Sequence, residues 1–126
     1  MTASDTVMRL IGGFNDKDMD TILGCFDDAS VYHNIPMESV TGVDAIRGVL
    51  EGLVAGASRI QWDVLFIAER DNVVLTERVD KFELNGNWIE LPVMGTFEVT
   101  GDTITAWRDY FDLADFQKQM AAAAGG

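Results

Sequence analysis

Five polar side chains in three short stretches of the chain have the types and spacing for acid–base chemistry. They form two pairs at i, i+2 and one single residue between aromatics, namely Tyr32 and Asn34, Arg78 and Asp80, and Asp109. Side chains two residues apart in a strand point to the same face, so each pair would point in one direction. Two carboxylates beside one arginine carry a net negative charge, and burial would favour the uptake of one proton. Such a pair contains one acid and one base at neutral pH, which suits proton transfer to and from a neutral substrate.

The surroundings of Asp109 favour a buried site. Trp107 and Phe111 share its strand face, which is a poor place for a carboxylate that faces solvent. An Arg-x-Asp pair on a strand, by contrast, is commonly an exposed ion pair. The residue types alone therefore leave open whether the three stretches meet in one cavity.

The second half of the chain has the pattern of an antiparallel meander. Four stretches rich in β-branched and aromatic residues are separated by short turns: 60–69, 73–84, 88–99 and 103–110. The turn Asn85-Gly86 is a strong hairpin signal, because both residue types tolerate a positive φ.

The first half has the spacing of helices. Apolar residues at i, i+3, i+4, i+7 predict two buried faces, Val7, Leu10, Ile11 and Phe14, then Met19, Ile22, Leu23 and Phe26. Asp18 is expected to cap the second of these helices. The stretch 31–35 is β-branched or aromatic and stops at Pro36, which predicts an edge or bent strand.

Two further helices are predicted. Thr41-Gly42-Val43-Asp44 resembles a capping box with Asp in place of Glu or Gln. The helix that follows would bury Val43, Ile46, Val49, Leu50, Leu53 and Val54. A closing helix is predicted over 112–120, with Asp112 as its cap, and residues 121–126 are expected to form a frayed tail.

These elements predict a single α+β domain over residues 1–126, with N-terminal helices packed on a strongly curved, mixed, mostly antiparallel sheet. Such a sheet would form a cone with an internal pocket. By strand parity and proximity, six apolar residues are expected to line this pocket and bind substrate: Leu53, Phe82, Leu91, Val93, Trp107 and Phe111.

Composition excludes several classes of partner. The 126 residues have 21 acidic against 9 basic side chains, a net charge of −12, so neither nucleic acid nor an anionic membrane surface is expected to bind. The chain has no apolar run of transmembrane length and begins without the pattern of a signal peptide. Cys25 has no second cysteine to pair with, and His33 is the one histidine, so no metal site is expected. A cytoplasmic setting fits best.

Three motifs, in this order along the chain, resemble the limonene epoxide hydrolase family. They are Tyr32-His33-Asn34, Glu77-Arg78-Val79-Asp80, and Trp107-Arg108-Asp109-Tyr110-Phe111-Asp112, the last followed by Leu113. The similarity runs from about the second helix to Leu113, and all five polar positions match. The resemblance implies the nuclear-transport-factor-two-like (SnoaL-like) cone fold, which also carries unrelated functions.

The resemblance implies a cofactor-independent epoxide hydrolase that adds water directly to a hydrophobic epoxide and gives a vicinal diol. Asp109 would be the general base, and Tyr32 and Asn34 would hold the water. Asp80 would be the protonated acid that donates to the epoxide oxygen, and Arg78 would bridge the two carboxylates. The family also implies a homodimer formed through the sheet.

Two alternatives remain at this point. The same fold could carry a ketosteroid-isomerase-like or polyketide-cyclase-like enzyme that uses one Asp as base, although Arg78 between two carboxylates would then have no evident purpose. The chain could also be a non-catalytic dimeric module that binds a small hydrophobic ligand in its cone.

Overall fold

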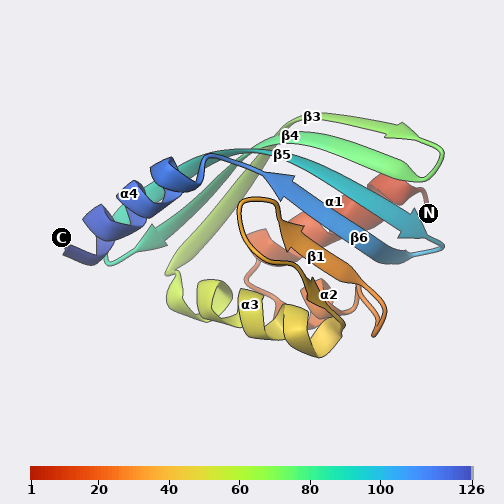
Figure 1. The fold of residues 1–126 in the computed structure, drawn as a ribbon, viewed down its shortest axis with the longest axis horizontal. Helices are drawn as coiled ribbons and strands as arrows, with labels where there is room; N and C mark the ends of the chain where they lie inside the picture. Colours follow the sequence, from red (N-terminus) through yellow and green to blue (C-terminus); the bar gives the residue numbers. More distant parts are fainter. Residues whose placement is uncertain (126) are drawn as a thin grey trace.

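A computed structural model describes residues 1–125, and in it one curved six-stranded sheet arches over helices (Figure 1). The elements along the chain are α1 (Ala3–Asn15), α2 (Met19–Leu23), β1 (Val31–Asn34), β2 (Val40–Thr41), α3 (Val43–Gly56), β3 (Arg59–Arg70), β4 (Val73–Leu84), β5 (Asn87–Thr100), β6 (Thr103–Tyr110) and α4 (Leu113–Gly125). The predicted α+β class and the helix-then-sheet order are confirmed.

The sheet is mixed and mostly antiparallel. Its strand order is β2-β1-β6-β5-β4-β3, and the β1–β6 pair is parallel while the other neighbours are antiparallel. The strand predicted over 31–35 as an edge or bent strand is present as β1, but the edge position is wrong, because β1 pairs with β6 on one side and with the two-residue β2 on the other. Pro36 still ends β1, since its ring cannot donate a ladder hydrogen bond.

Helix starts are set by local capping, with one departure from expectation. Thr2 and Asp5 form a capping box at α1, and the Asp18 carboxylate accepts from the Thr21 amide at α2. The predicted capping box before α3 is wrong, because Thr41 pairs with Val31 in β2 and the cap is Gly42, which has no side chain to offer. Gly42 has a φ of 95°, a conformation that favours glycine.

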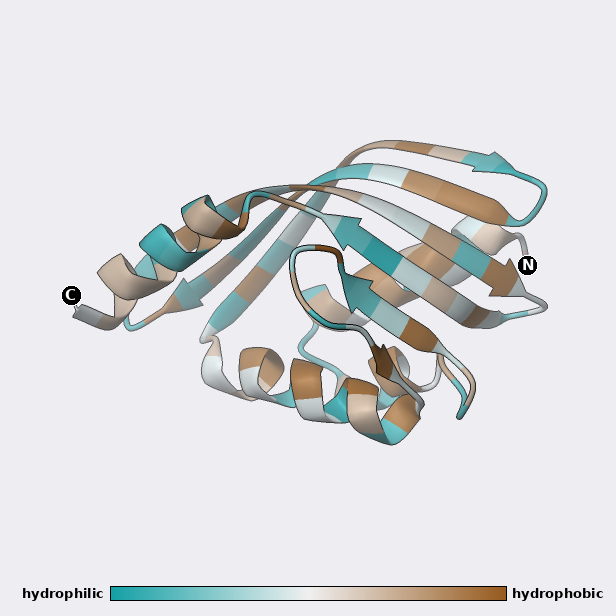
Figure 2. Cartoon of the chain, viewed as in Figure 1, coloured by the Kyte–Doolittle hydropathy of each residue, from teal (hydrophilic) through white to brown (hydrophobic). Residues whose placement is uncertain are grey.

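The core lies between the inner face of the sheet and helices α1, α2 and α3. Figure 2 shows hydrophobic and hydrophilic bands changing along the long strands, as expected when alternate side chains face opposite sides. On β4 the buried residues are Val74, Thr76, Arg78, Asp80 and Phe82. On α3 the burial of Ile46, Leu50 and Val54 is confirmed, but Val49 is 44% exposed.

The chain ends in a helix longer than predicted. Asp112 caps α4 by accepting from the Asp115 amide, as expected. Helix α4 then continues to Gly125, so 121–125 are helical where a frayed tail was expected, and residue 126 lies outside the described residues. None of the helices within 1–125 is long and apolar enough to cross a bilayer.

Candidate active site

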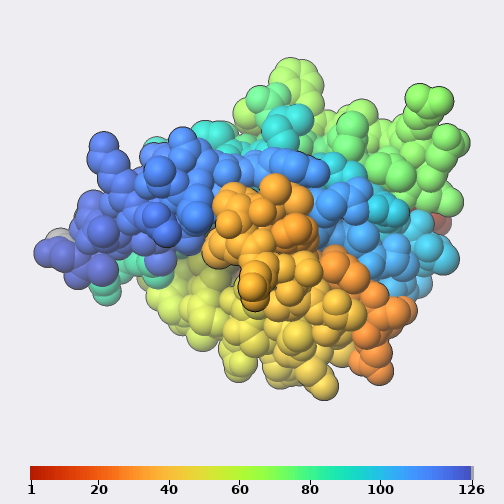
Figure 3. Space-filling view, viewed as in Figure 1, coloured from red at the N-terminus to blue at the C-terminus, as the bar shows by residue number. Residues whose placement is uncertain are grey.

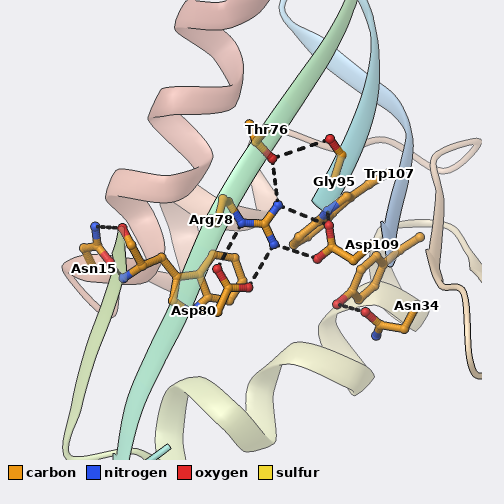
Figure 4. A network of polar contacts seen from close by, with 10 residues as sticks. Asn15, Asn34, Thr76, Arg78, Asp80, Gly95, Trp107 and Asp109 are labelled. Carbon is orange, nitrogen blue, oxygen red and sulfur yellow. Dashed lines mark hydrogen bonds and ion pairs between the residues drawn. The ribbon is translucent and has the colours of Figure 1, made fainter. Parts of the chain in front are cut away.

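The five polar side chains converge because the register aligns three strands around one glycine. Thr76 of β4 pairs with Gly95 of β5, and Gly95 pairs with Asp109 of β6. Asp109 in turn lies beside Asn34 of β1. Since Gly95 has no side chain, the strand between β4 and β6 leaves the space above it open, and Arg78 reaches across that space to Asp109 (Figure 4).

Arg78 bridges the two carboxylates with four hydrogen bonds. Its Nε and Nη2 donate to Asp80 Oδ1 and Oδ2 at 3.0 and 2.8 Å. Its Nη1 and Nη2 donate to Asp109 Oδ1 and Oδ2 at 3.2 and 2.9 Å. A fifth bond, from Nη1 to Thr76 Oγ1 at 3.1 Å, uses the last guanidinium hydrogen, so every Arg78 donor has a partner. This planar fork fixes the orientation of both carboxylates.

Two aromatic side chains complete the polar cluster. Trp107 Nε1 donates to Asp109 Oδ1 at 2.7 Å. The Tyr32 hydroxyl donates to Asn34 Oδ1 at 3.1 Å, which leaves the Asn34 amide hydrogens free for another acceptor. The Tyr32 and Trp107 rings stack with centroids 4.3 Å apart, so one aromatic stack holds both the Tyr32–Asn34 pair and the N–H that binds Asp109.

Burial controls the protonation of the cluster. Arg78, Asp80 and Asp109 are 1%, 5% and 4% exposed. Burial raises the pKa of the Asp80 carboxyl to about 6, against the opposing effect of the Arg78 charge. Burial works against the charge of Arg78, but the two carboxylates outweigh it and raise the pKa of Arg78 above its ordinary value. Burial also raises the pKa of Tyr32, which stays protonated. A carboxyl that is still partly protonated near neutral pH, beside a second carboxylate, can act as an acid.

A mostly apolar cavity of about 300 Å³ opens onto Asp80 and Asp109. Its lining comes from all sides of the cone: Tyr32, Asn34, Met37, Val49, Leu50, Gly52, Leu53, Trp62, Asp80, Phe82, Leu84, Leu91, Val93, Asp109, Phe111, Phe116 and Met120. In the view of Figure 3 the β1–β2 segment lies in front, between α4 and α3. Val49 and Leu53 of α3 line this cavity, which explains why they are not buried in the core.

Five of the six residues expected to line the pocket do so: Leu53, Phe82, Leu91, Val93 and Phe111. Trp107 does not, which corrects that expectation. Its ring is fully buried behind Tyr32 and packs against Phe97 and Phe26, so it contacts the site only through its N–H. Strand parity placed Trp107 on the correct face of the strand, but it could not show that other rings cover the side chain completely.

Several site residues were not identified from the sequence. Gly95 of β5 lies beside Arg78 and Asp109, and only the strand register brings it there. Thr76 precedes Arg78 by two residues on β4, so strand parity already places it on the same face, but its hydrogen bond from Arg78 was not expected. Trp62 lies opposite Asp80 on β3 and stacks on Phe14 at 3.9 Å. Phe116 and Met120 enter the cavity from α4. The spacing of four residues between those two was a usable signal of one helical face.

Within residues 1–125, no group of three or more His, Cys, Asp or Glu side chains is arranged to hold a metal ion. The oxygen-bearing side chains that line the cavity are those of Asp80 and Asp109, which Arg78 already binds, and those of Asn34 and Tyr32.

The chain is similar to known epoxide hydrolases. A family model described as the limonene-1,2-epoxide hydrolase catalytic domain matches residues 1–122. The chain is 30% identical over 116 residues to the epoxide hydrolase EphG of Mycobacterium tuberculosis. The aligned region covers 90% of this chain and 76% of that protein. A solved M. tuberculosis LEH-like epoxide hydrolase matches with a TM-score of 0.83 and 28% identity, over 97% of this chain and 91% of that one.

A more distant similarity concerns the fold alone. A Catenulispora acidiphila protein with a ketosteroid isomerase-like fold matches with a TM-score of 0.80 at 17% identity, over 94% of this chain and 93% of that one. This likeness shows the fold alone, and a fold does not fix a function, so the side chains inside the cone must decide it.

Proposed function

Because the chain belongs to the limonene-1,2-epoxide hydrolase family, we propose that it hydrolyses a hydrophobic epoxide to a vicinal diol by direct attack of water. The observation that carries this proposal is the pair of buried carboxylates joined by Arg78 on the wall of an apolar cavity. An enzyme that abstracts one proton needs a single base, whereas opening an epoxide needs an acid and a base together. The bridged pair supplies both.

Asp109 is the general base of the proposed reaction. Arg78 and Trp107 donate to it, and these hydrogen bonds fix the orientation of its carboxylate. Tyr32 and Asn34 lie on the neighbouring strand and hold the attacking water beside it. Fixing the water in line with the epoxide carbon removes most of the entropic cost of bringing the two reactants together.

Asp80 is the general acid. Its pKa of about 6, raised by burial, leaves roughly a tenth of the molecules protonated at pH 7, where an ordinary aspartate is almost fully ionised. The epoxide oxygen is a poor leaving group, so a proton donated as the ring opens lowers the barrier. A positioned acid or base contributes about 10²- to 10⁴-fold each. The proton count balances, because Asp109 takes a proton from water as Asp80 gives one to the epoxide oxygen.

The cavity suits a small hydrophobic substrate. About 300 Å³ enclosed by aliphatic and aromatic side chains fits an epoxide of terpene or cycloalkene type. Apart from the polar groups at the carboxylate end and the Trp62 indole, the walls are aliphatic, phenyl and methionine side chains. We therefore expect selectivity by shape rather than by further polar groups.

A homodimer formed through the outer face of the sheet is part of the proposal. That face exposes a group of large apolar side chains: Leu65, Phe66, Leu75, Met94 and Tyr110. The register places Phe66 opposite Glu77, and Glu77 opposite Met94, so this group spans β3 to β6 on the side away from the cavity. Such a patch is typical of a protein–protein interface.

The test is hydrolysis of a cyclohexene- or terpene-type epoxide in ¹⁸O-labelled water under single-turnover conditions. Direct attack places the label in the diol at the first turnover. Label found in Asp80 or Asp109, with an unlabelled first diol, would show a covalent intermediate and refute the mechanism. If no epoxide of a graded panel is hydrolysed while apolar ligands bind tightly, a binding module becomes the better description.

Two variants test the roles. Asp80→Asn and Asp109→Asn should each lower kcat by about 10²- to 10⁴-fold, because each removes one proton-transfer group. Asp63→Asn, at a half-buried β3 carboxylate that pairs with Lys81 and does not line the cavity, is the matched control and should leave kcat unchanged. A variant at either site that keeps near-normal turnover would show that its carboxylate is not required.

A further inference from the structure

The two oxygens of Asp109 have different surroundings. Oδ1 accepts from Trp107 Nε1 at 2.7 Å and from Arg78 Nη1 at 3.2 Å. Oδ2 accepts from Arg78 Nη2 at 2.9 Å, and no other residue within 1–125 donates to it. A carboxylate oxygen has two lone pairs in its plane, so Oδ1 is saturated and Oδ2 keeps one acceptor position.

Oδ1 also lies against the wall of the cone. A Cβ built on Gly95 would stand 2.6 Å from Oδ1, so this oxygen is packed onto the backbone of β5. Figure 4 shows Oδ1 on the side of Trp107 and Gly95, while the other oxygen meets the Arg78 nitrogen that also serves Asp80. Asp109 nevertheless lines the cavity. Its access to the cavity is therefore through Oδ2.

From this geometry we infer that Trp107 is a positioning residue, whose N–H occupies Oδ1 and so leaves Asp109 Oδ2 as the one atom that takes the proton from water. This inference rests on the proposed function, since it names the reacting atom of the proposed base. Trp107 itself touches neither substrate nor water, because its side chain is fully buried and has no surface on the cavity.

The surroundings of Trp107 fit this role. Its ring is stacked with Tyr32 at 4.3 Å and with Phe97 at 5.4 Å, and Phe14 meets its edge at 5.9 Å. An indole held on several sides cannot rotate its N–H away from Oδ1. The ring that orients the base is therefore the ring on which the proposed water-holding Tyr32 is stacked, so base and water keep one relative position.

The decisive variant replaces the N–H and keeps the ring. Position 107 is substituted with 3-benzothienylalanine, in which sulfur stands in place of the indole N–H, and Trp107→Phe is made in parallel. Each loses a hydrogen bond to a charged group, so kcat should fall about 10- to 100-fold. KM and the inhibition constant of the diol product should stay within about 2-fold, because Trp107 does not contact the cavity.

The controls separate the possible outcomes. Trp88→Phe removes an exposed tryptophan at the start of β5 and should leave kcat unchanged. If the benzothienyl enzyme keeps kcat within 3-fold of the wild type, the inference is wrong even though the proposed function stands. If kcat, KM and diol inhibition all change together, Trp107 supports the pocket as a whole and the inference is again wrong. A wild-type enzyme that hydrolyses no epoxide refutes the proposed function itself.

Discussion

Replacing Asp80 by asparagine should make the protein progressively more stable than the wild type as the pH rises from 4 to 7. The folded state holds the Asp80 proton up to a pKa of about 6, whereas an unfolded chain releases it near the ordinary value of 3.8. Between those values the folded state binds more protons than the unfolded state, so wild-type stability falls as the pH rises. Asparagine has no proton to lose and lacks this dependence.

The size of the effect follows from the pKa difference. Asp80 is raised by roughly two pKa units, and each unit corresponds to about 1.4 kcal/mol, so the wild type should lose about 3 kcal/mol relative to Asp80→Asn. The loss begins near pH 4 and is complete above the folded pKa. Asparagine also accepts from Arg78 with one oxygen instead of two. That lost hydrogen bond lowers the free energy of unfolding by the same amount at every pH, so it does not affect the slope.

The assay is urea unfolding of both proteins at half-unit steps from pH 4 to pH 7.5, with the free energy of unfolding compared at each step. Asp63→Asn is the control. The pKa of Asp63 is lowered by its hydrogen bonds to Lys81 and Gln61, so its difference from the wild type should be nearly constant above pH 5. A difference for Asp80→Asn that is equally flat would mean that Asp80 is ionised in the folded state, and it could not then be the acid.

Three further outcomes are expected. The kcat of the wild type should fall above a pH of about 6, approaching tenfold per unit, as Asp80 loses its proton, and a pH profile that stays level to pH 8 would contradict this. Gly95→Ala should lower kcat at least 100-fold, because its Cβ would push Asp109 and Arg78 apart. The control Gly48→Ala adds a Cβ that meets nothing within 4 Å, and it should raise the melting temperature in differential scanning calorimetry. Phe66→Asp, at a side chain 72% exposed, should halve the mass seen by light scattering without changing the far-UV spectrum.

Local patterns predicted much of the fold because they depend on neighbouring residues. The helical faces of α1 and α2, the Asp18 and Asp112 caps and the Asn85-Gly86 turn all rest on interactions within a few positions. The cap of α3 was wrong because Thr41 is taken up by pairing with Val31, a contact between segments that are ten residues apart. Sequence spacing cannot show that competition.

The sequence predicted which strand face each site residue lies on, but not how deeply each side chain is buried. Strand parity placed Arg78 and Asp80 on one face, and the motifs brought Asp109 to them. Parity also assigned Trp107 to the pocket, although other aromatic rings cover it completely. The role of Gly95 depends on the register of β4, β5 and β6, which is fixed by three strands together.

One nitrogen of Arg78 donates to both carboxylates, and this has a consequence for how the proposed reaction would return the site to its starting state. Nη2 lies 2.8 Å from Asp80 Oδ2 and 2.9 Å from Asp109 Oδ2. After the proposed reaction the proton is on Asp109 instead of Asp80, while the total charge of the cluster is the same. Since both oxygens flank one nitrogen, a single water that enters when the diol leaves can relay the proton back. On the proposed mechanism the site would then recycle its own proton inside the cone, without a buffer from the bulk.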